Sequence, residues 1–202
     1  MRLFFKRDDT SSTKQTNATL LFFFELIQIA AISMAIIIPV RYFLIQPFYV
    51  KGASMEPNFF DHEYLIIDEI SYRFREPIRG DILVFRYPND PKQFFIKRVI
   101  GLPSETIEIA EGLIKVYNDE SPNGFVLPEE EYIDQTFTAT TRSVTLKSDE
   151  YFVLGDNRAA SLDSRYFGPV KRDEVVGRVW VRGWPLDRWR IFETPSYEIQ
   201  EQ

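Results

Sequence analysis

The sequence contains no cysteine and only one histidine, His62. Without cysteine the chain has no thiol nucleophile, no disulfide and no thiolate metal ligand. His62 stands among acidic neighbours, with no second histidine to complete a zinc site or a His-based catalytic set. We therefore expect His62 to be a surface or turn residue.

Positive charge is also scarce, since 24 basic residues face 30 acidic ones and the formal net charge is −6. A nucleic-acid-binding protein would need a basic patch or stripe, so we expect no nucleic-acid partner. The one local excess of basic residues runs from Arg178 to Arg190 and is interleaved with tryptophans. We interpret it as a strand edge with solvated arginines. A chain of 202 residues fits one ordinary domain, with or without a small insertion.

Charge is nearly absent from Leu20 to Val40, where Glu25 is the one ionisable residue. A helix of this length spans about 30 Å, the thickness of a bilayer core. The run is longer than the ~7–15 apolar residues of a cleaved signal peptide, and a long polar stretch precedes it. We predict a transmembrane signal anchor over 20–43; the alternative is a buried helix of a soluble protein.

Basic residues precede this segment at Arg2, Lys6, Arg7 and Lys14, whereas only Arg41 and Lys51 follow it closely. The positive-inside rule then places residues 1–19 in the cytoplasm and residues 44–202 outside. We expect a single-pass protein of the plasma membrane; an internal membrane such as a thylakoid is the alternative location.

Short β-rich runs separated by turn residues follow the anchor, with no second long helical pattern. The sequence predicts strands at 64–67, 81–87, 94–101, 106–110, 113–117, 143–146, 151–154 and 175–181. Glu111-Gly112 is typical of a hairpin turn. We predict a mainly β domain, either a coiled antiparallel sheet or a partly open barrel, with a small insertion near 105–148.

Lys97 lies in the run FFIKRVIG, where alternation places it on one strand face with Phe95 and Val99. Neighbouring Arg98 lies on the other face and cannot deprotonate under working conditions, whereas a desolvated lysine can. Lys97 is thus the candidate base of this strand. Taken alone, a strand lysine is more often a surface residue.

Ser54 lies in GASMEPNFF, just after the anchor, among small residues that would let a peptide backbone approach. Taken alone it would be an ordinary turn serine. The segment GDNRAASLDSRYFG, residues 155–168, packs turn formers, acids and arginines together. It lacks the spacing and closing glutamate of an EF-hand, so we predict no metal site there.

In this order the segments resemble type I signal peptidase, from the anchor to about Trp189. ASMEP resembles the nucleophile box, GDILVF the buried structural strand, KRVIGLP the lysine box and GDNRAASLDSRYFG the final box. The resemblance implies no cofactor. The resemblance implies that Ser54 is the nucleophile and Lys97 the general base. It also implies that Ser161 orients the lysine amine, while Asp163 and Arg165 hold the site together.

The resemblance further implies a serine endopeptidase whose partners are the signal peptides of preproteins, with small residues at the first and third positions before the cut. Val50, Met55, Phe95 and Ile96 are candidates to line shallow apolar pockets for that peptide. Lowering the lysine pKa from about 10.4 to about 8 requires roughly 3 kcal/mol, which burial against Phe95 and Val99 would supply.

Three features depart from the family's pattern. GLPSE replaces the frequent GLPGD, the region between the lysine box and the final box is short, and Gly52 stands where some members carry a serine. That serine would donate a hydrogen bond to the oxyanion. We expect instead that Gly52 is required because the chain needs a positive φ there.

Two other classes of protein share parts of this pattern. Self-cleaving repressors use a similar Ser/Lys pair but carry a DNA-binding segment in place of a membrane helix. A membrane-tethered β module that binds a partner without catalysis would have no reason to keep Ser54, Lys97 and Ser161 together.

Overall fold

The computed structural model describes residues 10–43, 46–133, 138, 140–195 and 197. The chain divides into two compact units, Met1–Phe43 and Leu44–Gln202.

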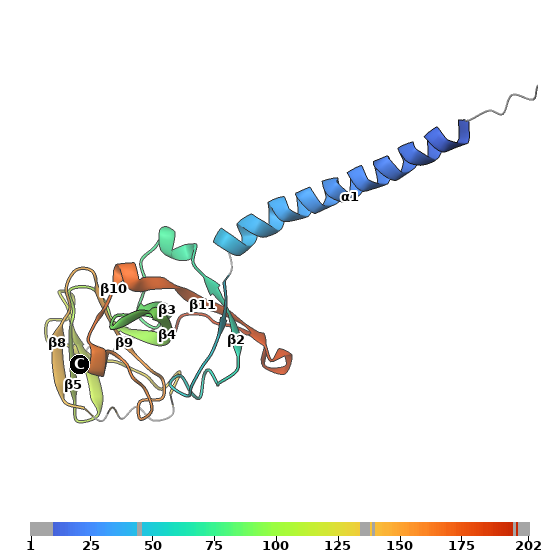
Figure 1. The fold of residues 1–202 in the computed structure, drawn as a ribbon. Helices are drawn as coiled ribbons and strands as arrows, with labels where there is room; N and C mark the ends of the chain where they lie inside the picture. The colour runs from blue at the N-terminus through green and yellow to red at the C-terminus, as the bar shows by residue number, and fades with distance from the viewer. Residues whose placement is uncertain (1–9, 44–45, 134–137, 139, 196, 198–202) are drawn as a thin grey trace, which may run out of the picture. The chain divides into compact units, whose positions relative to one another are not determined.

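The first unit consists of one long helix, α1, Thr10–Phe43 (Figure 1). Its segment Leu20–Ile38 has a mean hydropathy of 2.4 and is long and apolar enough to cross a membrane. The large apolar side chains of this segment are all more than half exposed. A helix that is apolar on every side needs an apolar surrounding, because in water this surface would be unfavourable.

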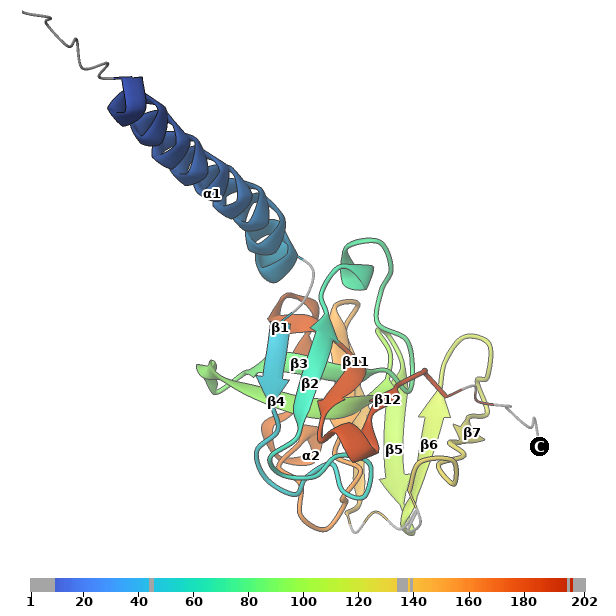
Figure 2. The ribbon, with the colours of Figure 1, turned by 90° about the vertical axis from the view of Figure 1, so that its right-hand side faces the viewer.

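The second unit is built on an eight-stranded antiparallel sheet. Its strand order is β1-β2-β11-β3-β4-β9-β10, with β12 paired to β11. The bounds are β1 Gln46–Tyr49, β2 Tyr64–Asp68, β3 Ile82–Tyr87, β4 Asp90–Gly101, β9 Glu150–Leu154, β10 Val170–Lys171, β11 Val175–Trp184 and β12 Arg190–Ile191. The sheet coils but its end strands do not pair, so it is not closed into a barrel (Figure 2).

A smaller four-stranded sheet is inserted between β4 and β9, with the order β7-β6-β5-β8. Its strands are β5 Thr106–Ala110, β6 Leu113–Tyr117, β7 Phe125–Val126 and β8 Arg142–Thr145. The predicted hairpin joins β5 to β6, and Glu111 and Gly112 both have positive φ, 53° and 82°. Such a pair of positive φ values suits the twist of a two-residue hairpin.

Short helical turns complete the unit. They are η1 Ser71–Arg73, α2 Ser164–Phe167, η2 Arg172–Glu174 and η3 Leu186–Arg188. The helix α2 lies inside the candidate segment 155–168, and the Asp163 carboxylate caps it by accepting a hydrogen bond from the backbone N–H of Arg165.

The core covers both faces of β3, as the apolar run ILVF predicts for a buried strand. Ile82 and Val84 join one core cluster, whereas Leu83 and Phe85 join another. All four side chains are buried. Since β4 pairs with β3, this strand fixes the position of Lys97, which lies opposite Leu83.

The predicted strands are all present, and most bounds agree within a residue or two. The exceptions are β4, which begins earlier at Asp90, and β11, which extends to Trp184. The short strands β1, β7, β10 and β12 were not predicted, because two to four residues carry too little periodicity.

The interpretation of Arg178–Arg190 as a solvated strand edge is wrong for Arg182. That side chain is buried, and its Nε lies 2.9 Å from an oxygen of buried Glu63. The guanidinium also lies over the Phe59 ring, 5.5 Å from its centroid. A buried arginine of this kind needs an acid from another segment, here Glu63 just before β2, and the sequence pattern alone does not reveal that partner.

Candidate active site

Ser54 lies in the loop between β1 and β2. The loop is closed at its base, where the backbone N–H of Val50 donates to the carbonyl of Glu63 at 2.8 Å. Met55 and Phe59 anchor the far side of the loop in the core, with 1% and 0% of their surface exposed. The serine is therefore held between two fixed points of the sheet unit while remaining partly exposed.

Lys97 reaches the same place from the middle of β4. Its side chain is 4% exposed. The Nζ atom lies 2.8 Å from Ser54 Oγ and 2.8 Å from the carbonyl oxygen of Ile96. It also lies 5.4 Å from the centroid of the Phe95 ring. The serine hydroxyl and the lysine amine are thus within direct proton-transfer distance.

Burial lowers the pKa of Lys97 to about 8, and the charges of Asp163 and Asp156 partly oppose that change. Desolvation disfavours the charged ammonium, whereas a nearby carboxylate favours it. The balance leaves a substantial neutral fraction of the amine near neutral pH. A neutral amine beside a serine hydroxyl can act as its general base.

Ser161 lies in the loop after β9 and is buried. Among the described residues its Oγ has no hydrogen-bond partner. A side chain at Gly155 would place its Cβ only 2.2 Å from Ser161 Oγ and 2.4 Å from the Ser54 carbonyl oxygen. Gly155 is therefore the residue that lets the Ser161 loop approach Ser54 closely.

Asp163 and Arg165 form a buried ion pair directly behind this loop. Arg165 donates from Nε to one carboxylate oxygen of Asp163 and from Nη2 to the other, both at 2.8 Å. Asp163 also accepts from the backbone N–H of Gly155 at 3.1 Å, and Arg165 donates to the carbonyl of Arg158 at 2.8 Å. The pair connects both ends of the loop that carries Ser161.

Two further buried ion pairs hold the same loop, and sequence reasoning missed both. Arg98 binds Asp156 with two bonds, of 2.8 and 2.7 Å. Arg158 binds Glu129 of the inserted segment. Alternation places Arg98 on the strand face opposite to that of Lys97. This placement is the one feature of the sequence that could have indicated the ion pair between Arg98 and Asp156. The second joins positions far apart in sequence, and no local pattern marks it.

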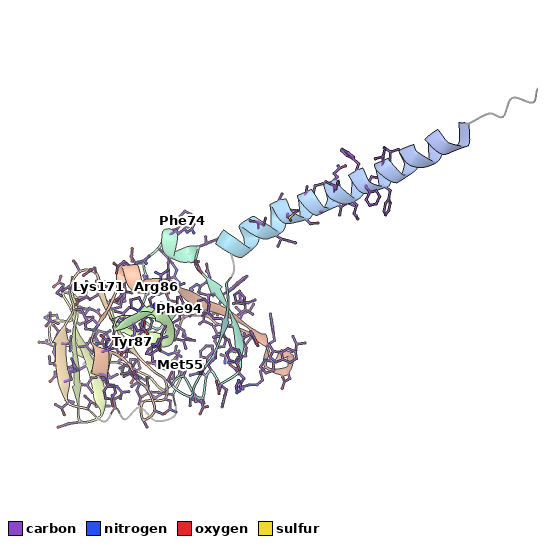
Figure 3. The ribbon with its side chains drawn as sticks, in the orientation of Figure 1. Met55, Phe74, Arg86, Tyr87, Phe94 and Lys171 are labelled. Carbon is purple, nitrogen blue, oxygen red and sulfur yellow. The ribbon has the colours of Figure 1, made fainter. Side chains whose placement is uncertain are left out.

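A cavity of about 360 Å³ opens beside Ser54 and Lys97. Val50, Phe95 and Ile96 line it, as do residues of β1, β2 and β3. Met55, the fourth candidate for peptide binding, does not line the cavity, because its buried side chain packs in a core cluster of the sheet unit. Figure 3 labels Met55 within this unit. The structure therefore gives Met55 no direct place at the cavity surface.

Gly52 has a φ of 90°, which confirms that the backbone there favours glycine. Its N–H donates to Asp61 Oδ1 at 3.0 Å. Neighbouring His62 is exposed and has a φ of 69°, so it is the turn residue that the sequence predicts.

A serine whose hydroxyl contacts a buried lysine of low pKa, on an open antiparallel sheet, is typical of serine peptidases that use a lysine base. The family model "Signal peptidase, peptidase S26" matches residues 23–184. The chain belongs to this family.

Relatives span most of the chain. It is 39% identical over 175 residues to "Probable signal peptidase I-2" of Synechocystis, covering 82% of this chain and 77% of the relative. It is 36% identical to "Signal peptidase I" of Leptolyngbya laminosa, covering 85% of both chains. It is 32% identical to "Signal peptidase IB" of Staphylococcus aureus, covering 82% of this chain and 92% of the relative. A crystal structure of a signal peptidase I from Enterococcus faecalis is 33% identical with a TM-score of 0.42, covering 52% of this chain and 97% of that one.

Proposed function

We propose that this protein is a membrane-anchored serine endopeptidase that removes signal peptides from preproteins. The observation that carries the proposal is the 2.8 Å contact between Lys97 Nζ and Ser54 Oγ, in a chain whose relatives bear the name signal peptidase I. In this proposal Ser54 is the nucleophile and Lys97 the general base.

The first half of the reaction forms an ester. Neutral Lys97 accepts the proton of the Ser54 hydroxyl while Oγ attacks the carbonyl carbon of the scissile peptide bond. Backbone N–H groups near Ser54 stabilise the oxyanion that develops on the carbonyl oxygen. When the C–N bond breaks, the Lys97 ammonium returns its proton to the new amine of the mature protein.

The second half releases the signal peptide. A water molecule gives a proton to Lys97 and attacks the ester carbonyl carbon. The bond to Ser54 Oγ then breaks, the oxygen regains a proton from Lys97, and the peptide leaves with a new carboxyl group that loses its proton to water. Ser161 Oγ, which has no hydrogen-bond partner among the described residues, would accept a hydrogen bond from the amine during these steps. Asp163 with Arg165 holds the loop that carries Ser161.

The cavity beside Ser54 supports the substrate class that membership of the family implies. The cavity beside Ser54 is lined mainly by apolar groups and is small, about 360 Å³, which suits small side chains of an extended peptide. Val50, Phe95 and Ile96 are the proposed contacts. Small residues at the first and third positions before the cut are the expected specificity.

The helix α1 provides the proposed anchor through Leu20–Ile38. Residues 1–19 would lie in the cytoplasm and residues 44–202 outside the plasma membrane. Basic residues are more frequent before the apolar segment than directly after it, which supports this orientation.

Cleavage of a model preprotein tests the function. The full chain is solubilised in detergent, incubated with a preprotein, and the products are located by mass spectrometry. We expect one cut after a small residue, and loss of at least about 1,000-fold in rate in Ser54→Ala. Equal cleavage by the parent and by Ser54→Ala would contradict the proposal.

A further inference from the structure

Asn157 lies in the loop after β9 and bonds to the segment that carries Ser54. Its Nδ2 donates to the carbonyl oxygen of Ala53 at 3.1 Å, and its backbone N–H donates to the carbonyl oxygen of Ser54 at 3.1 Å. At the other end of the side chain, Oδ1 accepts from the N–H of Ala160 at 3.2 Å. One residue thus bridges the serine segment and the loop of Ser161.

These bonds hold the two peptide planes on either side of the Ser54 Cα atom. The Ala53 carbonyl belongs to the preceding plane and the Ser54 carbonyl to the following one. Because a residue has only two soft backbone dihedrals, fixing both planes fixes the direction of its Cα–Cβ bond. That direction decides whether Ser54 Oγ meets Lys97, and the preceding plane also aims the N–H of Ser54.

The bridge rests on a rigid support. Asp156, just before Asn157, is paired with buried Arg98 at 2.7 Å. Arg158, just after it, is paired with buried Glu129 and donates from Nε to the carbonyl of Gly155 at 3.2 Å. Since both neighbours are fixed by buried ion pairs, Asn157 has little freedom to follow a displacement of Ser54.

We propose that Asn157 is a positioning residue that orients Ser54 for attack, an inference that rests on the proposed function. Its carboxamide is suited to this role because one end must donate to Ala53 while the other must accept from Ala160. In the proposed function Ser161 and Asp163 act on the general base Lys97. Asn157 acts on the nucleophile Ser54.

Asn157→Ala is the main test, and Asn118→Ala is its matched control. The Asn118 side chain makes the same two kinds of bond, accepting from Ser121 N at 2.8 Å and donating to Glu105 at 3.1 Å, but away from the site. For Asn157→Ala we expect kcat to fall about tenfold or more with KM changed less than about twofold, because a misplaced nucleophile slows chemistry rather than binding. Asn118→Ala should keep the parent's kcat.

The pH profile separates positioning of Ser54 from an effect on Lys97. Asn157→Ala should lower the plateau that kcat reaches at high pH. The apparent pKa through which kcat rises with pH should stay near the parent's value. If the plateau is unchanged, or if only the pKa moves, the inference is overturned. Where Asn157→Ala does not fold, Asn157→Asp keeps the acceptor for Ala160, removes the donor to Ala53 and adds a negative charge. For this variant the high-pH plateau alone is compared with that of the parent, and the same loss of plateau is expected.

Hydrogen exchange gives a readout that does not depend on activity. In Asn157→Ala the backbone amides of residues 50–58 should exchange faster than in the parent, while those of the β5–β6 hairpin should not change. An unchanged rate in 50–58 would overturn the inference even if the parent protein cleaved nothing. A parent that cleaves no preprotein would overturn the proposed function alone.

Discussion

Lys97 Nζ lies 2.8 Å from Ser54 Oγ, although the two residues are 43 positions apart in the sequence. Lys97 lies at the point where β4 becomes buried, and Ser54 lies in a loop beside the cavity. The loop side gives substrate access, and the strand side gives the desolvation that an amine base needs.

The rate of cleavage should rise with pH through a pKa of about 8, the value to which burial lowers Lys97. Below that pKa the amine is protonated and cannot accept the Ser54 proton, so activity is lost as pH falls. Between pH 7 and pH 9 the neutral fraction grows from about one tenth to about nine tenths, which predicts a rise of about tenfold in kcat/KM. A flat profile with a chemistry-limited substrate would show that Lys97 is not the base.

Lys97→Met should abolish cleavage and yet stabilise the protein near pH 7. Burial lowers the pKa of Lys97 from 10.5 to about 8, so below pH 8 the folded state carries the full cost of a buried ammonium. That cost is about 3 kcal/mol from the pKa difference. The net gain in the variant is smaller, because methionine cannot replace the two hydrogen bonds that Lys97 Nζ makes in the parent. A gain of about 1–3 kcal/mol in the free energy of unfolding is expected from urea titration.

The advantage of Lys97→Met should shrink as pH rises from about 8 to 10.5. In that window the unfolded parent binds more protons than the folded parent, so the stability of the parent increases with pH relative to the variant. Urea titrations of both proteins at pH 7 and pH 10 measure this difference. An advantage that stays constant would mean that Lys97 is not buried as described.

Gly52→Ser should lower kcat while KM changes little. The φ of 90° at Gly52 is unfavourable for any residue with a Cβ, by about 1–3 kcal/mol, and the strain would displace the segment leading to Ser54. Gly52→Ala is the control, since it carries the same strain without a hydroxyl. If Gly52→Ser turned over faster than the parent, a hydroxyl donor to the oxyanion would be the dominant effect and the strain argument would fail.

Protease added to intact spheroplasts should digest residues 44–202. The prediction follows from the excess of basic residues before the apolar segment Leu20–Ile38. Immunoblotting with an antibody against the β unit measures the loss, and a cytoplasmic marker protein serves as the control for intact cells. Full protection of the β unit with digestion after lysis would reverse the proposed orientation.

The sequence by itself determined the elements and the chemistry of individual residues. The apolar length of 20–40 indicated a helix that can cross a membrane, and alternation in FFIKRVIG placed Lys97 with Phe95 and Val99 on one face. The hairpin at Glu111-Gly112 and the need for glycine at Gly52 also followed from local backbone preferences. These features depend on neighbours within a few positions, so a single sequence suffices to predict them.

Only the tertiary structure decided how the distant segments meet. It buried Met55 in the core although this apolar residue beside Ser54 was a candidate for the cavity, and it buried Arg182 beside Glu63 in a stretch that looked solvated. It brought Glu129 of the insertion to Arg158, and Asn157 to the carbonyls of Ala53 and Ser54. The physical reason is that hydrogen bonds and ion pairs between remote segments depend on the packing of the whole sheet, and no local period in the sequence encodes their partners.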